Sequence, residues 1–559
     1  MKNNKKFLSL IIIFILIETG IVASNYATLY DRDDFEVQAI NTLALRSSTN
    51  GIFDSFPTTK TSLQDAINRV DITKLDNYEL KLYNKVLTML DEKSNLYNDE
   101  DSSVNGDILF SGAMRSYRTN SESLKQYELL EQYKDNLPWI DTRMQIDFGD
   151  YFYGYTQFEF QDENFYDYDE DVPSFDHSLH SSPFNDDNAY KLNSMEPLKI
   201  GLSAGSDNFN FQFGRNRLSE GSGITGNLII GDNYSRQDYI SYSLFSGFFS
   251  YHMSLTQFDL QKPDGSMYPV SFNNDSQYRV INRFTVTPLD NISFDFYQGA
   301  LFKTQYIDYR MILPFMYVHN YFNFDQDSST DGYNDEANNI LGANLKWVIM
   351  RGLEVNLQTV LDQYTLPTEN YGGFPNAYGI LFNIKNSISM KNGSLNNYIE
   401  AVYTSPYLYL NEKKESNGDE NYNYDWILGN YLTGSVDEIS YSGYIYGPDN
   451  LVLAYGFNYL SYNEWSVGTD FIFRMDGTKG IQTDRNSSVS IGDVDNTLFM
   501  VGTPEISFTI RPTVSFDINN VIFLNGVFGF VGKINRFHDI ASSVSYNIQG
   551  AISATIKLL

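Results

Sequence analysis

The chain of 559 residues has no cysteine and only five histidines. Without cysteine it can form no disulfide, no cysteine-ligated zinc site and no thiolate nucleophile, and it has no cysteine to carry the lipid of a lipoprotein. Histidine is too scarce for a histidine-built metal site, so we predict no metal and no other cofactor. Basic residues are also few, 39 against 70 acidic residues. Because nucleic acids bind to basic surfaces, the net charge of −31 predicts no nucleic-acid partner.

Long apolar runs are equally scarce. The run Phe7–Ile17 follows three lysines and precedes the small residues 22–24, which is typical of a secretory signal peptide. A bilayer-spanning helix needs about 20 residues, so we predict that residues 1–24 are removed. The alternative is an uncleaved helix at the membrane surface. Removal leaves 39 − 3 = 36 basic and 70 − 1 = 69 acidic residues, a net charge of −33.

After the signal no run of 18 apolar residues predicts a spanning helix. The chain instead shows the period of two that is typical of strands with one apolar and one polar face. Phe209, Phe211 and Phe213 alternate with polar neighbours. The same alternation occurs in residues 144–148, 353–358 and 506–511.

Three features favour a membrane barrel over a soluble sheet. Strand-like segments recur over 559 − 108 = 451 residues, which suggests about 18 strands at about 25 residues for each strand with its connection. The 43 tyrosines and 40 phenylalanines suit the headgroup zones of a bilayer, and the longer connections are acidic. We predict an all-β protein, with a transmembrane antiparallel β-barrel over residues 107–559 in the lipid of a bacterial outer membrane. The alternative is an exported soluble β-rich adhesin.

The segment before the barrel, residues 25–106, has a different pattern. Between Thr61 and Lys93 the apolar residues recur at a spacing of three to four, which predicts two short helices. We expect this short helical segment on the periplasmic side. The alternative is a disordered leader.

A stretch early in the predicted barrel, residues 213–259, resembles the core signature of the Wzi-like capsule-assembly proteins. The signature includes Gly214 and Arg215, a glycine-rich turn, the Gly-Asn-Leu step at residues 226–228 and the Asp-Asn step at residues 232–233. Where the family usually has a Trp-Gly-Pro-Gly turn, this chain has Ser219–Gly223. Later blocks follow in the family's order: Pro314, His319 and Asn320; Asn339, Leu341 and Gly342; Gln358 and Asp362; Leu428 and Gly429; and 447–450. The resemblance implies an outer-membrane barrel with a small helical part that holds surface polysaccharide as a lectin.

Two segments supply candidate ligand-binding residues. The first holds Arg215, Arg217, Asn227, Asp232 and Asn233 around four glycines. Because glycine permits positive φ and close backbone approach, one interpretation is a loop that folds into the lumen and narrows it or offers amides to a ligand. The other is an ordinary hairpin connection.

The second segment, residues 162–176, interleaves acidic residues with Tyr166 and Tyr168. Aromatic rings stack on sugars and carboxylates accept hydroxyl hydrogen bonds, so this mixture suits carbohydrate. It also suits divalent cations, which oxygen atoms bind. The alternative is a solvated extracellular loop.

No nucleophile elbow, HExxH motif or triad spacing stands out, so we predict no enzymatic activity. The leading hypothesis is a barrel that binds or retains surface polysaccharide through its extracellular loops. Because an acidic protein repels an acidic polymer, the glycan is expected to be neutral or bridged by divalent cations. The alternative is a diffusion porin whose acidic lumen passes cations or neutral solutes.

Overall fold

A computed structural model of the chain describes most of the residues after the predicted signal peptide. The described residues are 25–51, 54–90, 96–98, 102–120, 140–160, 199–232, 237–258, 260–261, 267–268, 276–304, 307, 309–316, 337–363, 376–414, 420–424, 427–432, 435–461, 465–479, 489–490, 495, 499–518, 521–540 and 544–558. The predicted signal peptide lies outside them.

The N-terminal segment forms three α-helices that share one core. They are α2 (Phe35–Ser47), α3 (Lys60–Asn68) and α4 (Asn77–Leu90), with the short 3-10 helix η1 (Ile72–Lys74) before α4. Val37, Ile40 and Leu63 are fully buried between them. The apolar spacing predicted helices at the positions of α3 and α4 and missed α2. Among the described residues, no helix is both long and apolar enough to cross a membrane.

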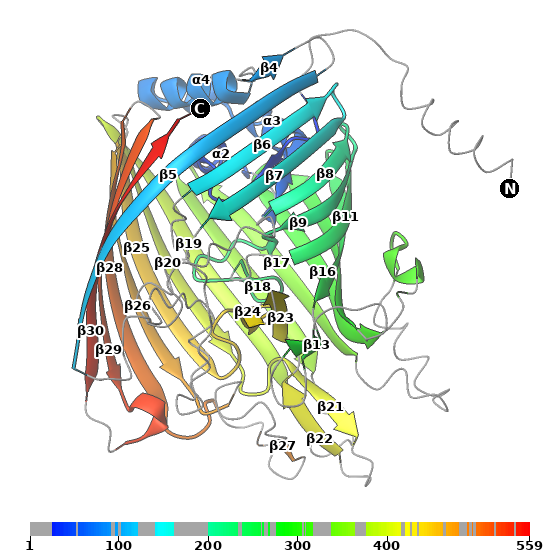
Figure 1. Cartoon of the computed structure of the whole chain (residues 1–559), viewed down its shortest axis with the longest axis vertical. Helices are drawn as coiled ribbons and strands as arrows, with labels where there is room; N and C mark the ends of the chain where they lie inside the picture. The colour runs from blue at the N-terminus through cyan, green and yellow to red at the C-terminus, as the bar shows by residue number, and fades with distance from the viewer. Residues whose placement is uncertain are drawn as a thin grey trace, which may run out of the picture.

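The rest of the described chain is a closed antiparallel β-barrel of 18 strands (Figure 1). The predicted fold class is therefore confirmed. The strands are β5 (Ser102–Thr119), β6 (Ile140–Phe148), β7 (Phe152–Phe160), β8 (Lys199–Gly205), β9 (Phe209–Asn216), β11 (Gln237–Phe245), β12 (Phe249–Phe258), β15 (Ser276–Leu289), β16 (Ile292–Thr304), β17 (Asn338–Met350), β18 (Leu353–Gln363), β19 (Ala377–Met390), β20 (Gly393–Thr404), β25 (Asn450–Ser461), β26 (Trp465–Asp476), β28 (Glu505–Ile518), β29 (Ile522–Ile534) and β30 (Ser545–Lys557).

Each strand pairs with its neighbour in the chain, and the ring closes where β30 pairs with β5, with Ile556 opposite Phe110. The short strand β4 (Tyr97–Asn98) extends this seam beside β5. Further short strands lie outside the ring: β1 (Leu29–Tyr30), β2 (Ser55–Phe56), β3 (Thr58–Thr59), β10 (Ser219–Glu220), β13 (Leu260–Gln261), β14 (Met267–Tyr268), β21 (Leu410–Lys414), β22 (Glu420–Tyr424), β23 (Ile427–Leu432), β24 (Ser435–Tyr441) and β27 (Val489–Ser490).

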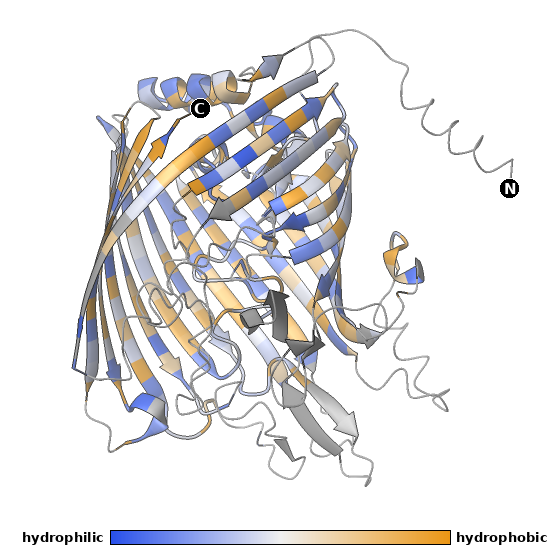
Figure 2. Cartoon of the chain, in the orientation of Figure 1, coloured by the Kyte–Doolittle hydropathy of each residue, from blue (hydrophilic) through white to orange (hydrophobic). Residues whose placement is uncertain are grey.

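The outer wall is apolar and the inner wall polar, the reverse of a soluble sandwich. On β9 the outward Phe209, Phe211 and Phe213 are 46%, 44% and 55% exposed, whereas the inward Asn210 and Gln212 are 2% and 4% exposed. Figure 2 shows the same alternation of hydrophobic and hydrophilic residues along many strands. A bilayer requires apolar side chains on the outer wall and a closed set of backbone hydrogen bonds between the strands, because lipid cannot form hydrogen bonds with free backbone groups.

The two ends of the barrel differ in the length of their connections. At one end residues 290–291 and 351–352 make short turns, and the N-terminal helices lie across this end (Figure 1). At the other end the connections are long, as between β16 and β17 and between β20 and β25. Outer-membrane barrels have short periplasmic and long extracellular connections, which puts the helices on the periplasmic side.

Candidate functional site

The connection between β9 and β11 enters the barrel. Its residues Leu228, Ile229 and Ile230 are 0–1% exposed and belong to the main core cluster, which includes inward-facing residues of the wall such as Ile281 and Val452. Burying each of these three side chains contributes about 1.5–3 kcal/mol. We call residues 217–232 the luminal loop. Of the two interpretations of this glycine-rich segment, the structure supports the loop that fills the lumen.

Several wall residues bind the backbone of the luminal loop, among them Asn383 and Lys385 on β19, which donate to the Ser222 carbonyl at 3.1 and 2.9 Å. Glu400 on β20, 1% exposed, accepts hydrogen bonds from the N–H groups of Ile224 and Thr225, both at 2.7 Å, and from the Thr225 hydroxyl at 2.6 Å. Gln358 on β18 accepts from the N–H of Leu228 at 2.7 Å. Hydrogen bonds to a carboxylate are about twice as strong as neutral ones, so Glu400 is the principal anchor.

Two glycines let this loop fold so tightly. A Cβ on Gly223 would lie 1.8 Å from the carbonyl oxygen of Gly226, which is a backbone clash. Gly226 itself has a φ of +149°, a conformation that side chains rarely adopt. The side-chain oxygen of Asn227 then accepts from the N–H of Gly223 at 2.8 Å and stabilises the turn.

The N-terminal segment meets the luminal loop from the periplasmic side. β2 pairs with β10, so that Phe56 lies opposite Ser219, and the N–H of Gly221 donates to the carbonyl of Asp54 at 2.8 Å. Lys346 on the wall is ion-paired with Asp54 at 3.0 Å. The periplasmic helices and the luminal loop therefore form one continuous plug.

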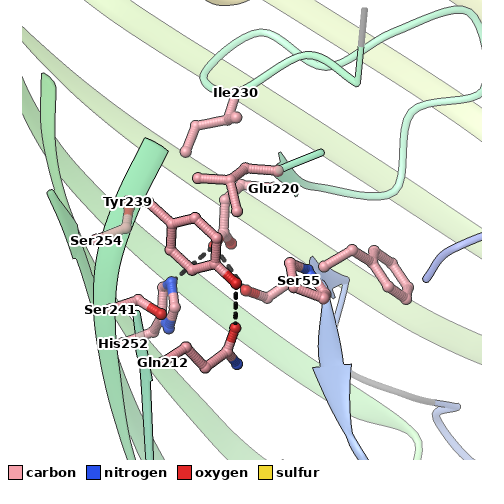
Figure 3. A pocket seen from close by; sticks show the side chains of 11 residues that line it. Ser55, Gln212, Glu220, Ile230, Tyr239, Ser241, His252 and Ser254 are labelled. Atoms are coloured by element: carbon pink, nitrogen blue, oxygen red, sulfur yellow. Dashed lines mark hydrogen bonds and ion pairs between the residues drawn. The ribbon is translucent and has the colours of Figure 1, made fainter. Parts of the chain in front are cut away.

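Glu220 links the luminal loop to the N-terminal segment and to the barrel wall (Figure 3). Its carboxylate accepts from the Ser55 hydroxyl at 2.6 Å and lies 2.7 Å from Arg283 and 3.2 Å from the Nε2 of His252. Burial raises the pKa of Glu220 above its ordinary value, although Arg283 opposes this shift. Beside it, the Tyr239 hydroxyl donates to Gln212 at 2.7 Å. The cavity between these side chains measures about 10 Å³, room for about one water molecule.

A third segment covers the luminal loop from the extracellular side. In the connection between β20 and β25, the Tyr409 hydroxyl donates to the carbonyl of Leu228 at 2.7 Å and accepts from the N–H of Tyr444 at 2.9 Å. Arg279 on β15 donates to the hydroxyl of Ser442 at 2.7 Å. The connection between β20 and β25 thus packs on the luminal loop, which the barrel wall holds in place from the inside.

The structure separates the sequence-predicted site residues. Arg215 faces outward at the end of β9 and is ion-paired with Asp238 at 2.6 Å, and Arg217 lies 3.7 Å from Asp33. Asn227 is fully buried inside the luminal loop, and Asp232 lies 3.5 Å from Arg32.

The remaining candidates, Asn233, Tyr166 and Tyr168, lie outside the described residues. The ligand-binding role of all seven candidates stays a prediction. Within the described parts of the chain, no group of three or more histidine and acidic side chains is arranged to hold a metal ion.

Sequence analysis missed the residues that hold the plug. Glu400, Arg279 and Arg283 are ionisable side chains on the inner face of strands, where an unpaired charge would face the lumen. The period of two predicts that these three side chains lie on the polar face of their strands. It does not predict which residues of the plug they bind. Glu400 and Thr225 lie 175 residues apart in the sequence.

These features define a class: an outer-membrane β-barrel whose lumen is filled by its own loops and closed at the periplasmic end by helices. No protein-family model and no curated protein matches the sequence. Among solved structures, the chain is similar to Wzi of Escherichia coli, an outer-membrane protein involved in group 1 capsule assembly and described as a carbohydrate-binding β-barrel. The TM-score is 0.56 and the identity 12%, and the match covers 94% of this chain and 99% of Wzi.

Two further similarities are more distant. OccK3 of Pseudomonas aeruginosa has a TM-score of 0.37 and 9% identity, covering 82% of this chain and 96% of its own. OccAB1 of Acinetobacter baumannii has a TM-score of 0.40 and 9% identity, covering 82% of this chain and 97% of its own. The predicted resemblance to Wzi-like proteins is confirmed at the level of the fold. The shared fold and the apolar outer wall place the chain in the bacterial outer membrane.

Proposed function

We propose that this chain binds or retains surface polysaccharide through its extracellular loops and does not act as an open pore. The observation that carries the proposal is the occupied lumen, in which Leu228, Ile229 and Ile230 pack against the wall. A diffusion channel needs a continuous polar path, and a packed apolar core across the lumen opposes one. The same core gives the extracellular loops a fixed support.

Fixed loops favour the binding of a polymer. A loop that is already ordered loses less conformational entropy on binding, so more of its contact energy appears as affinity. Tyr409 and Ser442 tie the connection between β20 and β25 to the luminal loop and to the wall. Wzi, which shares the fold, is described as carbohydrate-binding, and this supports the proposed binding of polysaccharide.

The charge of the chain restricts the ligand. With a net charge of −31, or −33 without the signal, the protein repels an acidic polysaccharide over about 8 Å at physiological salt. We therefore propose a neutral glycan, or an acidic glycan bridged by divalent cations, and a binding role without catalysis.

Retention of polysaccharide on cells tests the proposal. We expect the double variant Tyr166→Ala and Tyr168→Ala to release more polysaccharide into the medium than the wild type. Loss of two stacking rings removes about 1–3 kcal/mol of contact. Tyr97→Ala, at an exposed tyrosine of the periplasmic end, is the matched control and should retain it. Equal retention in all three strains would remove these tyrosines from the site.

Conductance tests the porin alternative. We expect the purified wild-type barrel to remain closed in planar bilayers. A large, steady, cation-selective current in the wild type would overturn the binding proposal and favour the porin.

A further inference from the structure

The strands between β5 and β12 are shorter than those on the other side of the barrel. β8 has seven residues, β9 has eight, and β6, β7 and β11 have nine each, whereas β28, β29 and β30 have 13 or 14. At about 3.3 Å for each residue and a tilt of about 40°, β8 rises about 18 Å and β28 about 35 Å. Figure 1 shows β6, β7, β8 and β9 close to the end that carries the helices, while β28, β29 and β30 continue to the other end. We call β6, β7, β8, β9 and β11 the low wall.

The neighbour of the low wall, β5, continues past it toward the extracellular end. Its residues 102–110 pair with β6, whereas residues 109–119 pair with β30. Among the residues that the structure describes, none pairs with the second edge of β5 beyond residue 110. A free strand edge cannot face hydrocarbon, because lipid offers no partner to its N–H and C=O groups. The region beside this edge, on the extracellular side of the low wall, therefore contains water or polar groups.

Charged side chains on the low wall face outward at a depth where lipid would be expected. The outward positions of β9 are apolar as far as Phe213, and the next is Arg215, which is ion-paired at 2.6 Å with the outward Asp238 on β11. Arg215 lies six residues from Phe209 at the periplasmic turn, a rise of about 15 Å in an apolar band of about 25 Å. On β29 the outward residue at the same distance from its turn is Phe528. The protein leaves 52% of the Asp238 side chain uncovered, and an ionised group at this depth requires water.

The space behind the low wall also contains exposed charges. Arg217, at the start of the luminal loop, lies 3.7 Å from Asp33 of the N-terminal segment, whose side chain is 82% exposed. Lys199, at the extracellular end of β8, is ion-paired with Asp31, and their side chains are 21% and 33% exposed. We call the space that these four side chains border the rim chamber. The rim chamber is therefore hydrated, and it lies at the level of the outward ion pair on β9 and β11.

We propose that the low wall forms a lateral opening, through which a glycan whose acyl chains lie in the outer leaflet enters the rim chamber. This inference rests on the proposed function and names its substrate class, a lipid-anchored surface polysaccharide. The low wall ends just beyond the middle of the apolar band, so the opening faces the outer leaflet and not the inner one. A molecule anchored in that leaflet meets the barrel from the side, and β28, β29 and β30 close the other side over the full band. The charged side chains of the rim chamber suit a sugar, because hydrogen bonds between charged groups and hydroxyls are strong.

Single cysteines test the opening, because the chain has no cysteine of its own. Each folded variant, verified by heat-modifiable gel mobility, is placed in liposomes and treated with a charged maleimide that cannot enter hydrocarbon. We expect Asp238→Cys to react, since water reaches the top of the low wall. Phe528→Cys, outward at a matching height and 52% exposed, is the control and should react only with a lipid-soluble maleimide. Equal protection of both cysteines from the charged reagent would overturn the opening.

Asp33→Cys then reports on the ligand. We expect lipopolysaccharide in the same liposomes to slow its labelling by the charged maleimide several-fold, and the polysaccharide freed from its acyl chains by mild acid to have no such effect. Ile540→Cys, 75% exposed in the connection between β29 and β30, is the control and should be labelled at one rate throughout. Equal slowing by the two glycans would overturn lateral entry and leave the proposed function intact, because it indicates approach from the extracellular side. No slowing by either glycan would also overturn the inference, and the retention assay on cells judges the proposed function separately.

Discussion

Removal of the Glu400 carboxylate should release the luminal loop and open the barrel. In Glu400→Ala the N–H groups of Ile224 and Thr225 lose their acceptor, whereas the Thr225 hydroxyl keeps its hydrogen bond with the Tyr444 hydroxyl at 2.9 Å and the wall strand keeps its backbone pairing. Each buried donor left unpaired costs about 1–3 kcal/mol. Because Ile224 and Thr225 are only partly buried and water can replace some of the contact, we take about 2–4 kcal/mol for the whole change.

That free energy converts into a measurable opening. At 1.4 kcal/mol for each tenfold change, the ratio of open to closed loop should rise by about 30- to 700-fold. Single-channel recording in planar bilayers measures the ratio directly, as the fraction of time spent in conducting bursts. Glu400→Gln keeps one carbonyl acceptor and should give an intermediate value.

The control variant, Asp470→Ala, removes one negative charge from the lumen, as Glu400→Ala does, but removes no contact with the luminal loop. Asp470 on β26 contacts the Tyr398 hydroxyl at 2.8 Å and Arg511 at 2.9 Å, both on the wall. Asp470→Ala should therefore leave the open fraction at the wild-type level. If Glu400→Ala is as closed as the wild type and the luminal loop is equally resistant to protease, the carboxylate does not hold the loop.

Three further outcomes are expected. Gly223→Ala should raise the conductance of the barrel, because the added Cβ would lie 1.8 Å from the Gly226 carbonyl oxygen and displace the luminal loop. Gly247→Ala is the control and should not change the conductance, because the space around its Cβ is open. Equal conductance of the two variants would contradict the tight packing at Gly223. Phe211→Lys, on the outer wall, should lower the free energy of unfolding in liposomes by about 2–4 kcal/mol relative to Phe211→Leu, and no difference would place Phe211 outside the lipid. Burial raises the pKa of Asp449 from 3.8 to about 7, so its stabilising contribution is complete below about pH 4 and is lost as the pH rises through 7. The N–H groups of Lys479 and Val501 donate to the Asp449 carboxylate, so proteolysis next to these two residues should increase with pH in the wild type and lose this dependence in Asp449→Asn.

The period of two carried most of the fold prediction. It assigns Phe209, Phe211 and Phe213 to one face of a strand, and because 18 such strands close into a ring, this face becomes the lipid-facing wall. The number of strands followed from the length of chain available. The helix α2 was missed although Val37 and Ile40 lie at helical spacing.

The candidate site was predictable only in part. The glycines of the luminal loop show that the chain can fold tightly there, which made a loop in the lumen one of two interpretations. The choice between them depends on contacts with Glu400 and Gln358, which come from strands far away in the sequence. A single sequence gives the polarity of those positions but not their partners.

The alternation of outward apolar and inward polar residues is most informative on the strands that depart from it. On β15 and β16 the outward positions should be apolar, yet Asn282 and Gln298 occupy two of them. In a wall that meets only lipid these amides would lower stability, because no acceptor or donor in the hydrocarbon replaces water. Residues 309–316, in the connection between β16 and β17, supply one of the missing partners, because the Met316 carbonyl accepts a hydrogen bond from Gln298 at 2.6 Å. A buried amide at an outward position of a barrel strand thus marks a place where protein, and not lipid, covers the wall.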